Sequence, residues 1–206
     1  EQIDEAVDFL GASLATSSVR INGSSLSKHK TTILELMQDI LMNPTFPEEE
    51  LEKIKKEALS GLEASQSDAN FAADNEKGIV LYGAEHPYGE VQTAADINNV
   101  TAADCRAYFE KWWKPNSAYL VIVGDVNLKE AKKLSKKYFG AWQQGTVEKL
   151  SYADPSAPAQ TRVAFVDRPS SVQSVINVCY PIEITPGHPD FIKTSVMNGI
   201  LGGGVF

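Results

Sequence analysis

The sequence of 206 residues has few of the side chains from which metal centres and disulfide frameworks are built. It contains two cysteines, Cys105 and Cys179, and three histidines, His29, His86 and His188. The cysteines form no CxxC pair, so they make neither a disulfide framework nor a thiolate zinc site by themselves. No histidine has another histidine within five residues of it. This excludes HExxH, HxxEH and HxH ligand pairs within the chain.

An excess of basic charge and a long hydrophobic run are also missing. The 27 acidic and 19 basic residues give a formal net charge of -8. Such an acidic surface argues against nucleic acid or an anionic membrane as a partner. No apolar run reaches the roughly 18 to 20 residues that span a bilayer. We therefore expect neither a nucleic-acid partner nor a membrane span.

Motifs for other chemistries are absent as well. A phosphate-binding loop carries Lys-Ser/Thr after its glycines or opens a helix, whereas Gly202–Gly204 close an expected helix, which favours a C-cap. There is no GxSxG nucleophile elbow, and Asp125 after Gly124 is typical of a turn. His86 and His188 each precede a proline in an expected loop, where histidines are usually solvated or cap a turn. The residues alone predict no catalytic, cofactor-binding or metal-binding residue in this chain.

What the sequence does contain is hydrophobic periodicity of two kinds, which predicts a mixed α/β (α+β) fold. Apolar residues recur at helical spacing in most of the chain, and shorter runs rich in β-branched residues are typical of strands. Expected helices cover residues 3–14, 27–42, 47–62, 70–81, 101–112, 128–138 and 189–201. Expected strands cover residues 17–22, 117–124, 162–166 and 172–180.

The periodicity also predicts how the chain is divided. It is lost between residues 145 and 160, where Pro155 and Pro158 occur, and this indicates an inter-domain linker at 147–158. The expected domains are then 1–146 and 159–206. Because the chain opens directly on an amphipathic helix and stops at a glycine-rich loop, we expect the first domain to lack its N-terminal part and the second to be truncated.

Five stretches occur in an order that identifies a resemblance. They are Asn43–Lys53 (NPTFPEEELEK), His86–Gly89 (HPYG), the stretch from Ile97 to Gly124, Tyr138–Trp142 (YFGAW), and Ile200–Gly204 (ILGGG). In the third stretch the matching residues are Val100, Thr101, Asp104, Tyr108, Pro115, Asn116, Leu120, Val121 and Gly124, followed by Asp125. Together they resemble the pitrilysin/insulinase/mitochondrial processing peptidase family of zinc metallopeptidases over nearly the whole chain. The resemblance implies metallopeptidase-like domains in which helices pack on an antiparallel sheet. Such domains occur in pairs that enclose a peptide-binding chamber.

The resemblance also identifies where zinc ligands belong. Active members hold zinc through an inverted HxxEH helix and a glutamate on a later helix, and the motif's own glutamate acts as general base. Aligning Leu51–Leu62 with the pattern of that later helix places Gly61 at the ligand and Ile54 at a second, assisting glutamate. Glu57 and Glu63 are turned roughly 40° and 160° away from residue 61, at about 100° per helical residue. The alignment therefore implies no zinc ligand in this chain.

Three hypotheses for function follow. The first is a non-catalytic half or subunit of a zinc peptidase, inactive alone, which completes a peptide-binding chamber. Its expected partners are peptide substrates and a homologous catalytic half that holds the zinc. The second is a fragment of an active zinc endopeptidase whose ligand is Glu57 or Glu63, and the third is a protein-binding module without a proteolytic role. The compartment stays open, with the bacterial periplasm or cell envelope as a working hypothesis.

Overall fold

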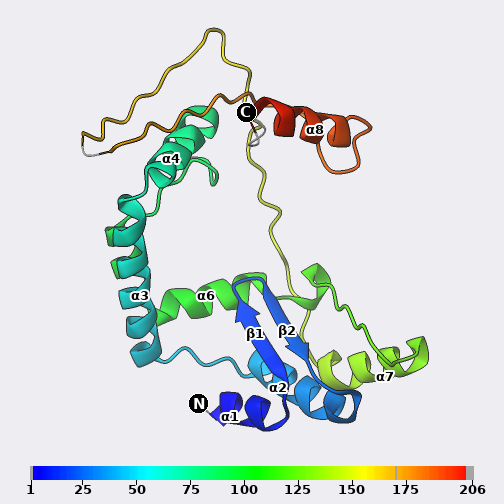
Figure 1. The fold of residues 1–206 in the computed structure, drawn as a ribbon. Coiled ribbons are helices and arrows are strands. Elements are labelled where there is room, and N and C mark those ends of the chain that lie inside the picture. Colours follow the sequence, from blue (N-terminus) through cyan, green and yellow to red (C-terminus); the bar gives the residue numbers. More distant parts are fainter. Residues whose placement is uncertain (1, 170, 203–206) are drawn as a thin grey trace. The chain divides into compact units, whose positions relative to one another are not determined.

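A computed structural model describes residues 2–169 and 171–202, which contain helices and one antiparallel β hairpin (Figure 1). The elements in chain order are α1 (Gln2–Phe9), β1 (Ser13–Ser17), β2 (Arg20–Ser24), η1 (Ser27–His29), α2 (Lys30–Met42), α3 (Glu48–Gln66), α4 (Ala69–Tyr82), α5 (Ala94–Asn99), α6 (Ala102–Trp112), η2 (Pro115–Ser117), α7 (Leu128–Phe139) and α8 (Phe191–Gly202). The mixed α/β class expected from the sequence is confirmed. The chain divides into two compact units, Glu1–Ser60 with Ala94–Leu150 and Gly61–Thr93 with Ser151–Phe206.

The β hairpin organises the first unit. Its strands pair antiparallel with Leu14 opposite Gly23, and Leu14, Ile21 and Gly23 are the half-buried residues of the hairpin. A Cβ atom on Gly23 would lie 2.9 Å from Sδ of Met37 and 3.0 Å from Cγ1 of Ile33. Glycine therefore allows α2 to approach β2 closely. One face of the hairpin packs on this helix, and the other, composed of polar and small residues, meets solvent.

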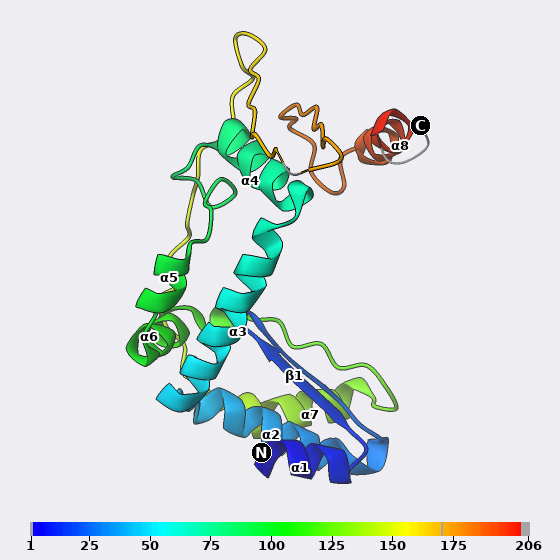
Figure 2. The same cartoon turned by 60° about the vertical axis from the view of Figure 1, so that its left-hand side comes forward.

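The core of the first unit lies where α2 contacts α7 beside the hairpin (Figure 2). Ile33 and Leu41 of α2 are buried, and Tyr138 of α7 is 2% exposed. An ion pair between Lys30 of α2 and Glu130 of α7 joins the same two helices at a half-exposed position. Apolar residues at helical spacing thus bury one face of each helix, as the periodicity predicts.

Helix α6 begins with a capping box. The Thr101 hydroxyl oxygen accepts a hydrogen bond from the Asp104 N–H at 3.2 Å, and Asp104 Oδ2 accepts from the Thr101 N–H at 2.9 Å. The Thr101 hydroxyl also donates to Asp104 Oδ2 at 2.6 Å. These hydrogen bonds stabilise the carboxylate and hold the pKa of Asp104 below its ordinary value. The helix start expected at Thr101 is confirmed.

The second unit is arranged around α4 and the turn that follows it. A Cβ atom on Gly78 would lie 2.5 Å from the carbonyl oxygen of Tyr88, and one on Gly89 would lie 2.1 Å from the carbonyl oxygen of Gly83. The backbone of the His-Pro-Tyr-Gly turn therefore lies directly against α4. Both positions require glycine because no side chain fits between the two backbone segments.

Arg168 fastens a distant segment of the second unit to the end of α3. Its guanidinium donates to the carbonyl oxygens of Gln66 at 3.0 Å, Ser67 at 2.8 Å and Asp68 at 3.2 Å. The last carbonyl groups of a helix have no partner within the helix. Arg168 supplies that partner for Gln66, the last residue of α3. Its hydrogen bonds to Ser67 and Asp68 stabilise the connection between α3 and α4.

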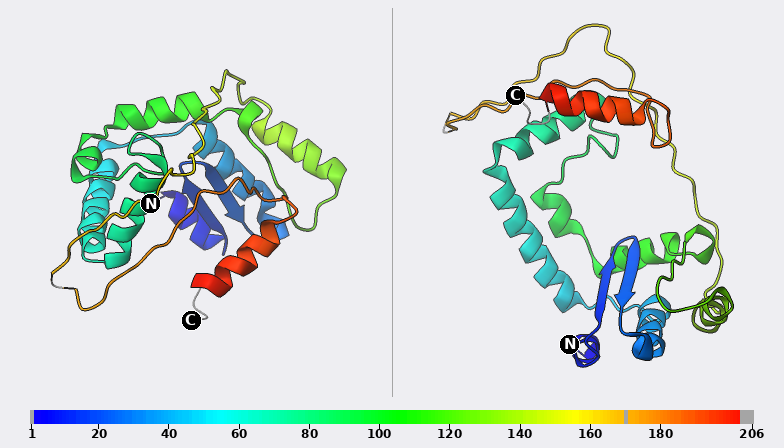
Figure 3. Two further views of the ribbon diagram at one scale, coloured as in Figure 1. Left: turned by 90° about the horizontal axis from the view of Figure 1, so that it is seen from above. Right: turned by 45° about the vertical axis from the view of Figure 1, so that its right-hand side comes forward.

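Several strand predictions are wrong. Residues 118–124 are extended but belong to no β ladder among the described residues. Residues 162–166 and 172–180 lie in the long connection before α8, which Figure 3 shows without strand arrows. A strand needs a hydrogen-bonding neighbour, and within the described part of the chain only β1 and β2 provide one for each other.

Two boundaries near the N-terminal end also differ from the prediction. The expected strand at 17–22 spans the hairpin turn, so Val19 is exposed at the tip rather than aligned with Ile21. The expected helix at 3–14 ends earlier, because Gly11 adopts a left-handed conformation with a φ of 57° and β1 begins at Ser13. The remaining expected helices are confirmed as α2, α3, α4, α6, α7 and α8, with small shifts at their ends.

Candidate functional site

Helix α3 is the element on which the sequence places the missing zinc ligand. Three acidic residues, Glu48, Glu49 and Glu50, occupy its first turn, where they suit the positive end of the helix dipole. Lys53 forms ion pairs with Glu49 at 3.2 Å and Glu50 at 2.8 Å. The hydrogen bond from Lys53 to Glu50 raises the pKa of this lysine. The charges at this end of α3 therefore stabilise the helix itself.

A third ion pair continues this pattern and anchors the helix. Lys55 bonds Glu52 at 3.0 Å and also donates to the carbonyl oxygen of Asn98 at 3.1 Å. That carbonyl belongs to α5, so Lys55 joins the two helices within the first unit. These three ion pairs engage Glu49, Glu50 and Glu52 with lysines of the same helix.

The ligand position itself is open and carries no donor atom. A Cβ atom added to Gly61 would meet nothing within 4 Å, and Ile54 is 60% exposed. Seven residues of α-helix return to within about 20° of the same direction, so both positions share one face of α3. Glu57 and Glu63 are both exposed. Glu63 lies on another face, whereas Glu57 lies about 40° from residue 61 and borders this face. Gly61 and Ile54 themselves do not fit a zinc ion, because zinc requires nitrogen, sulfur or carboxylate oxygen ligands.

The rest of the described chain offers no other metal-binding group. Among residues 2–169 and 171–202, no three His, Cys, Asp or Glu side chains lie close enough together to hold a metal ion. Cys105 in α6 is half-buried and Cys179 is exposed, and both are free thiols. No described helix is both long and apolar enough to cross a membrane.

The His-Pro sequences form two similar turns. Nδ1 of His86 accepts a hydrogen bond from the N–H of Tyr88 at 3.1 Å, and Nδ1 of His188 accepts from the N–H of Asp190 at 3.1 Å. Each imidazole therefore caps the backbone two residues further on, as expected of a histidine in a turn. The third histidine, His29, ends η1 at the start of α2.

His86 also belongs to an aromatic cluster that sequence reasoning missed. Its ring stacks on Tyr82 at 5.0 Å between centroids, and it meets Tyr88 at 5.4 Å and Tyr152 at 5.3 Å. Tyr82 precedes the His-Pro-Tyr-Gly motif and Tyr88 is its tyrosine, so both could have indicated this cluster. Tyr152 lies in the expected linker and carries no local signal. The cluster holds the turn and part of the linker together in the second unit.

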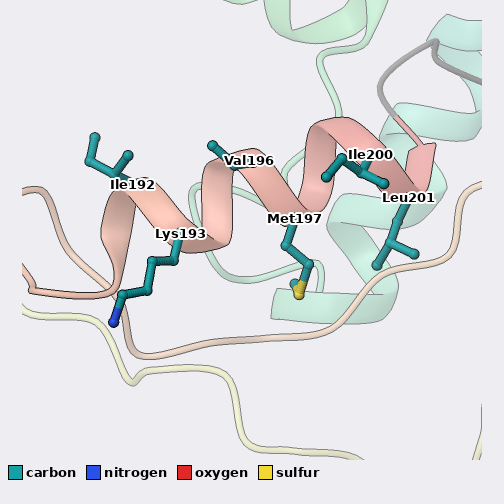
Figure 4. A pocket seen from close by; sticks show the side chains of 6 residues that line it. All are labelled: Ile192, Lys193, Val196, Met197, Ile200 and Leu201. Carbon is teal, nitrogen blue, oxygen red and sulfur yellow. The ribbon is translucent and has the colours of Figure 1, made fainter.

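Helix α8 presents an apolar surface in the second unit. Its side chains Ile192, Val196, Met197, Ile200 and Leu201 are exposed and, with Lys193, line a pocket along one side of the helix (Figure 4). They recur at intervals of three and four residues, which is the spacing of one helical face. Among the described residues, Lys193 is the one polar side chain that lines this pocket, whereas a catalytic centre usually has several converging polar groups.

The fold is that of a metallopeptidase-like domain. The chain belongs to the family described as "Peptidase M16 inactive domain", whose model matches residues 99–206. This match confirms the resemblance seen in the sequence.

Comparison with known proteins agrees with this assignment. The chain is 23% identical over 204 residues to the "Non-peptidase homolog YmxG" of Helicobacter pylori, which covers 98% of this chain and 46% of that protein. It therefore spans about half the length of this curated relative.

Two solved structures share the fold. One is an M16 inactive domain from Pseudomonas fluorescens, with a TM-score of 0.65 and 24% identity over 76% of this chain and 39% of that one. The other is the first half of the periplasmic protease PqqL from Escherichia coli, with a TM-score of 0.59 and 18% identity over 76% of this chain and 36% of that one.

Proposed function

We propose that this chain forms a non-catalytic half or subunit of a peptidase and that a homologous half carries the zinc. The observation that carries the proposal lies on α3, where Gly61 is open to solvent and Ile54 occupies the same face. Neither residue offers an atom to a metal, whereas zinc is what activates water in the active members of the family. The contribution of this chain is then to bind and enclose the substrate.

In this proposal, the chain and its partner half together form a chamber around a peptide. The family description, "inactive domain", supports a role without catalysis, as does the name of the Helicobacter pylori relative. The Escherichia coli structure is one half of a larger protease, which supports assembly from halves. We further propose that residues 1–146 and 159–206 belong to two homologous domains joined by residues 147–158.

The proposal is tested by zinc content and peptidase activity. The purified chain is incubated with zinc chloride, separated from unbound metal by gel filtration and measured by mass spectrometry, alone and with a homologous half that carries HxxEH. Unstructured peptides serve as substrates. We expect activity and about one zinc only when the second half is present. Tight stoichiometric zinc in the isolated chain would contradict the proposal.

Two variants separate the leading hypothesis from an active fragment. Glu57→Gln and Glu63→Gln remove the carboxylates that a different alignment of α3 would assign to zinc. We expect neither change to lower the zinc content or the activity of the assembled pair. A loss of zinc with either variant would instead support the active fragment. Failure of the chain to co-purify with an HxxEH-bearing chain, in a cell extract that contains one, would favour a binding module without a proteolytic role.

A further inference from the structure

Helix α7 concentrates positive charge on a chain that is acidic as a whole. Its 12 residues include five lysines and one glutamate, which give the helix a formal charge of +4. The whole chain has a formal net charge of -8, so the remainder of the chain carries -12. The one glutamate, Glu130, already forms an ion pair with Lys30 of α2. The positive charge of α7 is therefore not balanced within the helix.

Four of the five lysines form one side of α7, the lysine face. At about 100° per helical residue, they fall within an arc of about 100° around the helix axis. This arc lies opposite Tyr138, which is 2% exposed and belongs to the core. All four side chains of the lysine face are exposed: Lys129, Lys132, Lys133 and Lys136.

The fifth lysine, Lys137, is engaged beside this face. Its Nζ donates a hydrogen bond to the Tyr138 hydroxyl at 2.7 Å and lies 4.4 Å from the centroid of the same ring. The Tyr138 hydroxyl in turn donates to Oε1 of Glu35 in α2 at 3.4 Å. Lys137 therefore interacts with side chains at the junction of α2 and α7, and it is not counted in the lysine face.

The ammonium groups of the lysine face form no ion pair with any described residue. Other lysines of the first unit do pair with nearby acids, as Lys53 does with Glu49 and Glu50. Like charges three or four residues apart on a helix repel each other. Because the four lysines are spaced at such intervals, a bound anionic group would relieve repulsion as well as form new ion pairs.

We propose that the lysine face binds a short acidic segment of another protein. The seven residue steps from Lys129 to Lys136 cover about 10 Å along the helix, a length that three or four extended residues span at about 3.3 Å each. A segment with several carboxylates over that length could face all four ammonium groups. This inference goes beyond the proposed function, because such binding needs neither zinc nor a second peptidase half.

Larger polyanions fit the lysine face less well. Ionic screening acts over about 8 to 10 Å at physiological salt, so a short segment on α7 is shielded from much of the charge on the rest of the chain. A nucleic acid or a membrane surface extends further and meets that negative charge. Helices that lie in a membrane surface also present a broad apolar face, whereas Leu128 is the one exposed apolar side chain of α7 in the described chain.

Fluorescence anisotropy of the 206-residue chain tests the proposal. The probe is a fluorescein-labelled peptide that alternates glutamate and serine over about eight residues, which is long enough to cover the lysine face. The control probe has glutamine in place of each glutamate. We expect the acidic peptide to bind and the control peptide not to bind. The affinity should fall at least about tenfold between low salt and about 0.5 M sodium chloride, because exposed charges are screened.

Two matched double variants locate the binding. Lys132→Gln with Lys136→Gln removes two charges from the lysine face, and glutamine has a similar helix propensity. Lys56→Gln with Lys149→Gln removes the same charge from exposed lysines elsewhere in the first unit. We expect the first pair to weaken binding of the acidic peptide at least about fivefold and the second pair less than about twofold. Circular dichroism checks that both variants are folded.

Four results would overturn the proposal. The first is no binding of the acidic peptide at low salt. The second is an equal loss with the two double variants, which would show that binding follows the net charge and not the lysine face. The third is tighter binding to phosphatidylserine vesicles or single-stranded DNA than to the peptide. The fourth is a dimer in light scattering that the α7 variant abolishes, which would assign the face to a second copy.

Discussion

The indole N–H of Trp113 donates a hydrogen bond to the carbonyl oxygen of Ser18 at 3.0 Å and fastens the end of α6 to the tip of the β hairpin. The same ring stacks on Phe109, with 5.3 Å between centroids. Phe109 in turn meets the edge of Phe46, just before α3, at 6.1 Å. One row of aromatic rings thus joins the hairpin, α6 and the entrance to α3 within the first unit.

Trp113→Phe should lower the free energy of unfolding by about 1 kcal/mol, because it removes one hydrogen bond and retains most of the aromatic stacking. Urea denaturation followed by circular dichroism measures the change. Trp112→Phe is the control, since the neighbouring ring contacts Lys111 instead, and its effect should be smaller. Equal losses for the two variants would show that the bond to Ser18 contributes nothing specific.

Gly61→Ala and Gly78→Ala should change stability in opposite directions, although both glycines lie inside helices. A methyl group at residue 61 meets open space, so alanine should stabilise α3 by about 1 kcal/mol through helix propensity. A methyl group at residue 78 would lie 2.5 Å from the Tyr88 carbonyl oxygen. Displacing that backbone should cost about 1 to 3 kcal/mol. Thermal unfolding of both variants checks the prediction, and a stabilising Gly78→Ala would contradict the close contact.

Thr101→Ala should destabilise α6 by about 1 kcal/mol at pH 7, because it removes the side chain that caps the helix. The effect should shrink in acid. Because the folded-state pKa of Asp104 lies below its ordinary value of 3.8, the unfolded chain binds protons first as the pH falls. The carboxylate's contribution is therefore complete above that ordinary value and disappears as the pH drops through the lowered pKa. Unfolding curves of both proteins from pH 7 to pH 2 measure this, and a difference independent of pH would contradict it.

Trypsin should cut first after Lys149. This residue is exposed and lies in the expected linker at 147–158, outside the helices and strands of the described chain, and such segments are the preferred sites of proteolysis. Mass spectrometry of the early fragments locates the cut, and Lys149→Gln should slow the first step. Early cleavage within α7 at Lys136 or Lys137 would argue that the segment is not the most accessible part of the chain.

The helices could be predicted from the sequence because their signals are local. Pro47 with three following glutamates identifies the start of α3, and Thr101 with Asp104 identifies the start of α6, without reference to any other part of the chain. The strands could not be placed in this way. Residues 118–124 have the composition of a strand, but a ladder depends on a neighbour that composition does not reveal. At the hairpin, Val19 and Ile21 are apolar residues two positions apart, as in one continuous strand. The sequence pattern therefore gives no sign of the turn between β1 and β2.

The residues of the candidate site also differ in whether a local sequence pattern could reveal them. Gly61 and Ile54 were assigned from a pattern along one helix, and the structure places them on one open face. The cluster around His86 was missed because Tyr152 reaches it from more than sixty residues away. The requirement for glycine at residue 78 was missed for the same reason, since it arises from contact with the turn at Tyr88.

The open space around Gly61 has a consequence for how this protein can change. A Cβ atom added at residue 61 would meet no atom within 4 Å apart from the helix's own backbone, so the first carbon of a longer side chain fits there. Mutating a glycine codon to glutamate can take a single nucleotide substitution. In the alignment of α3 with the active enzymes, the ligand on this helix is therefore one mutation away, while recovery of catalysis would still require the remaining ligands from elsewhere.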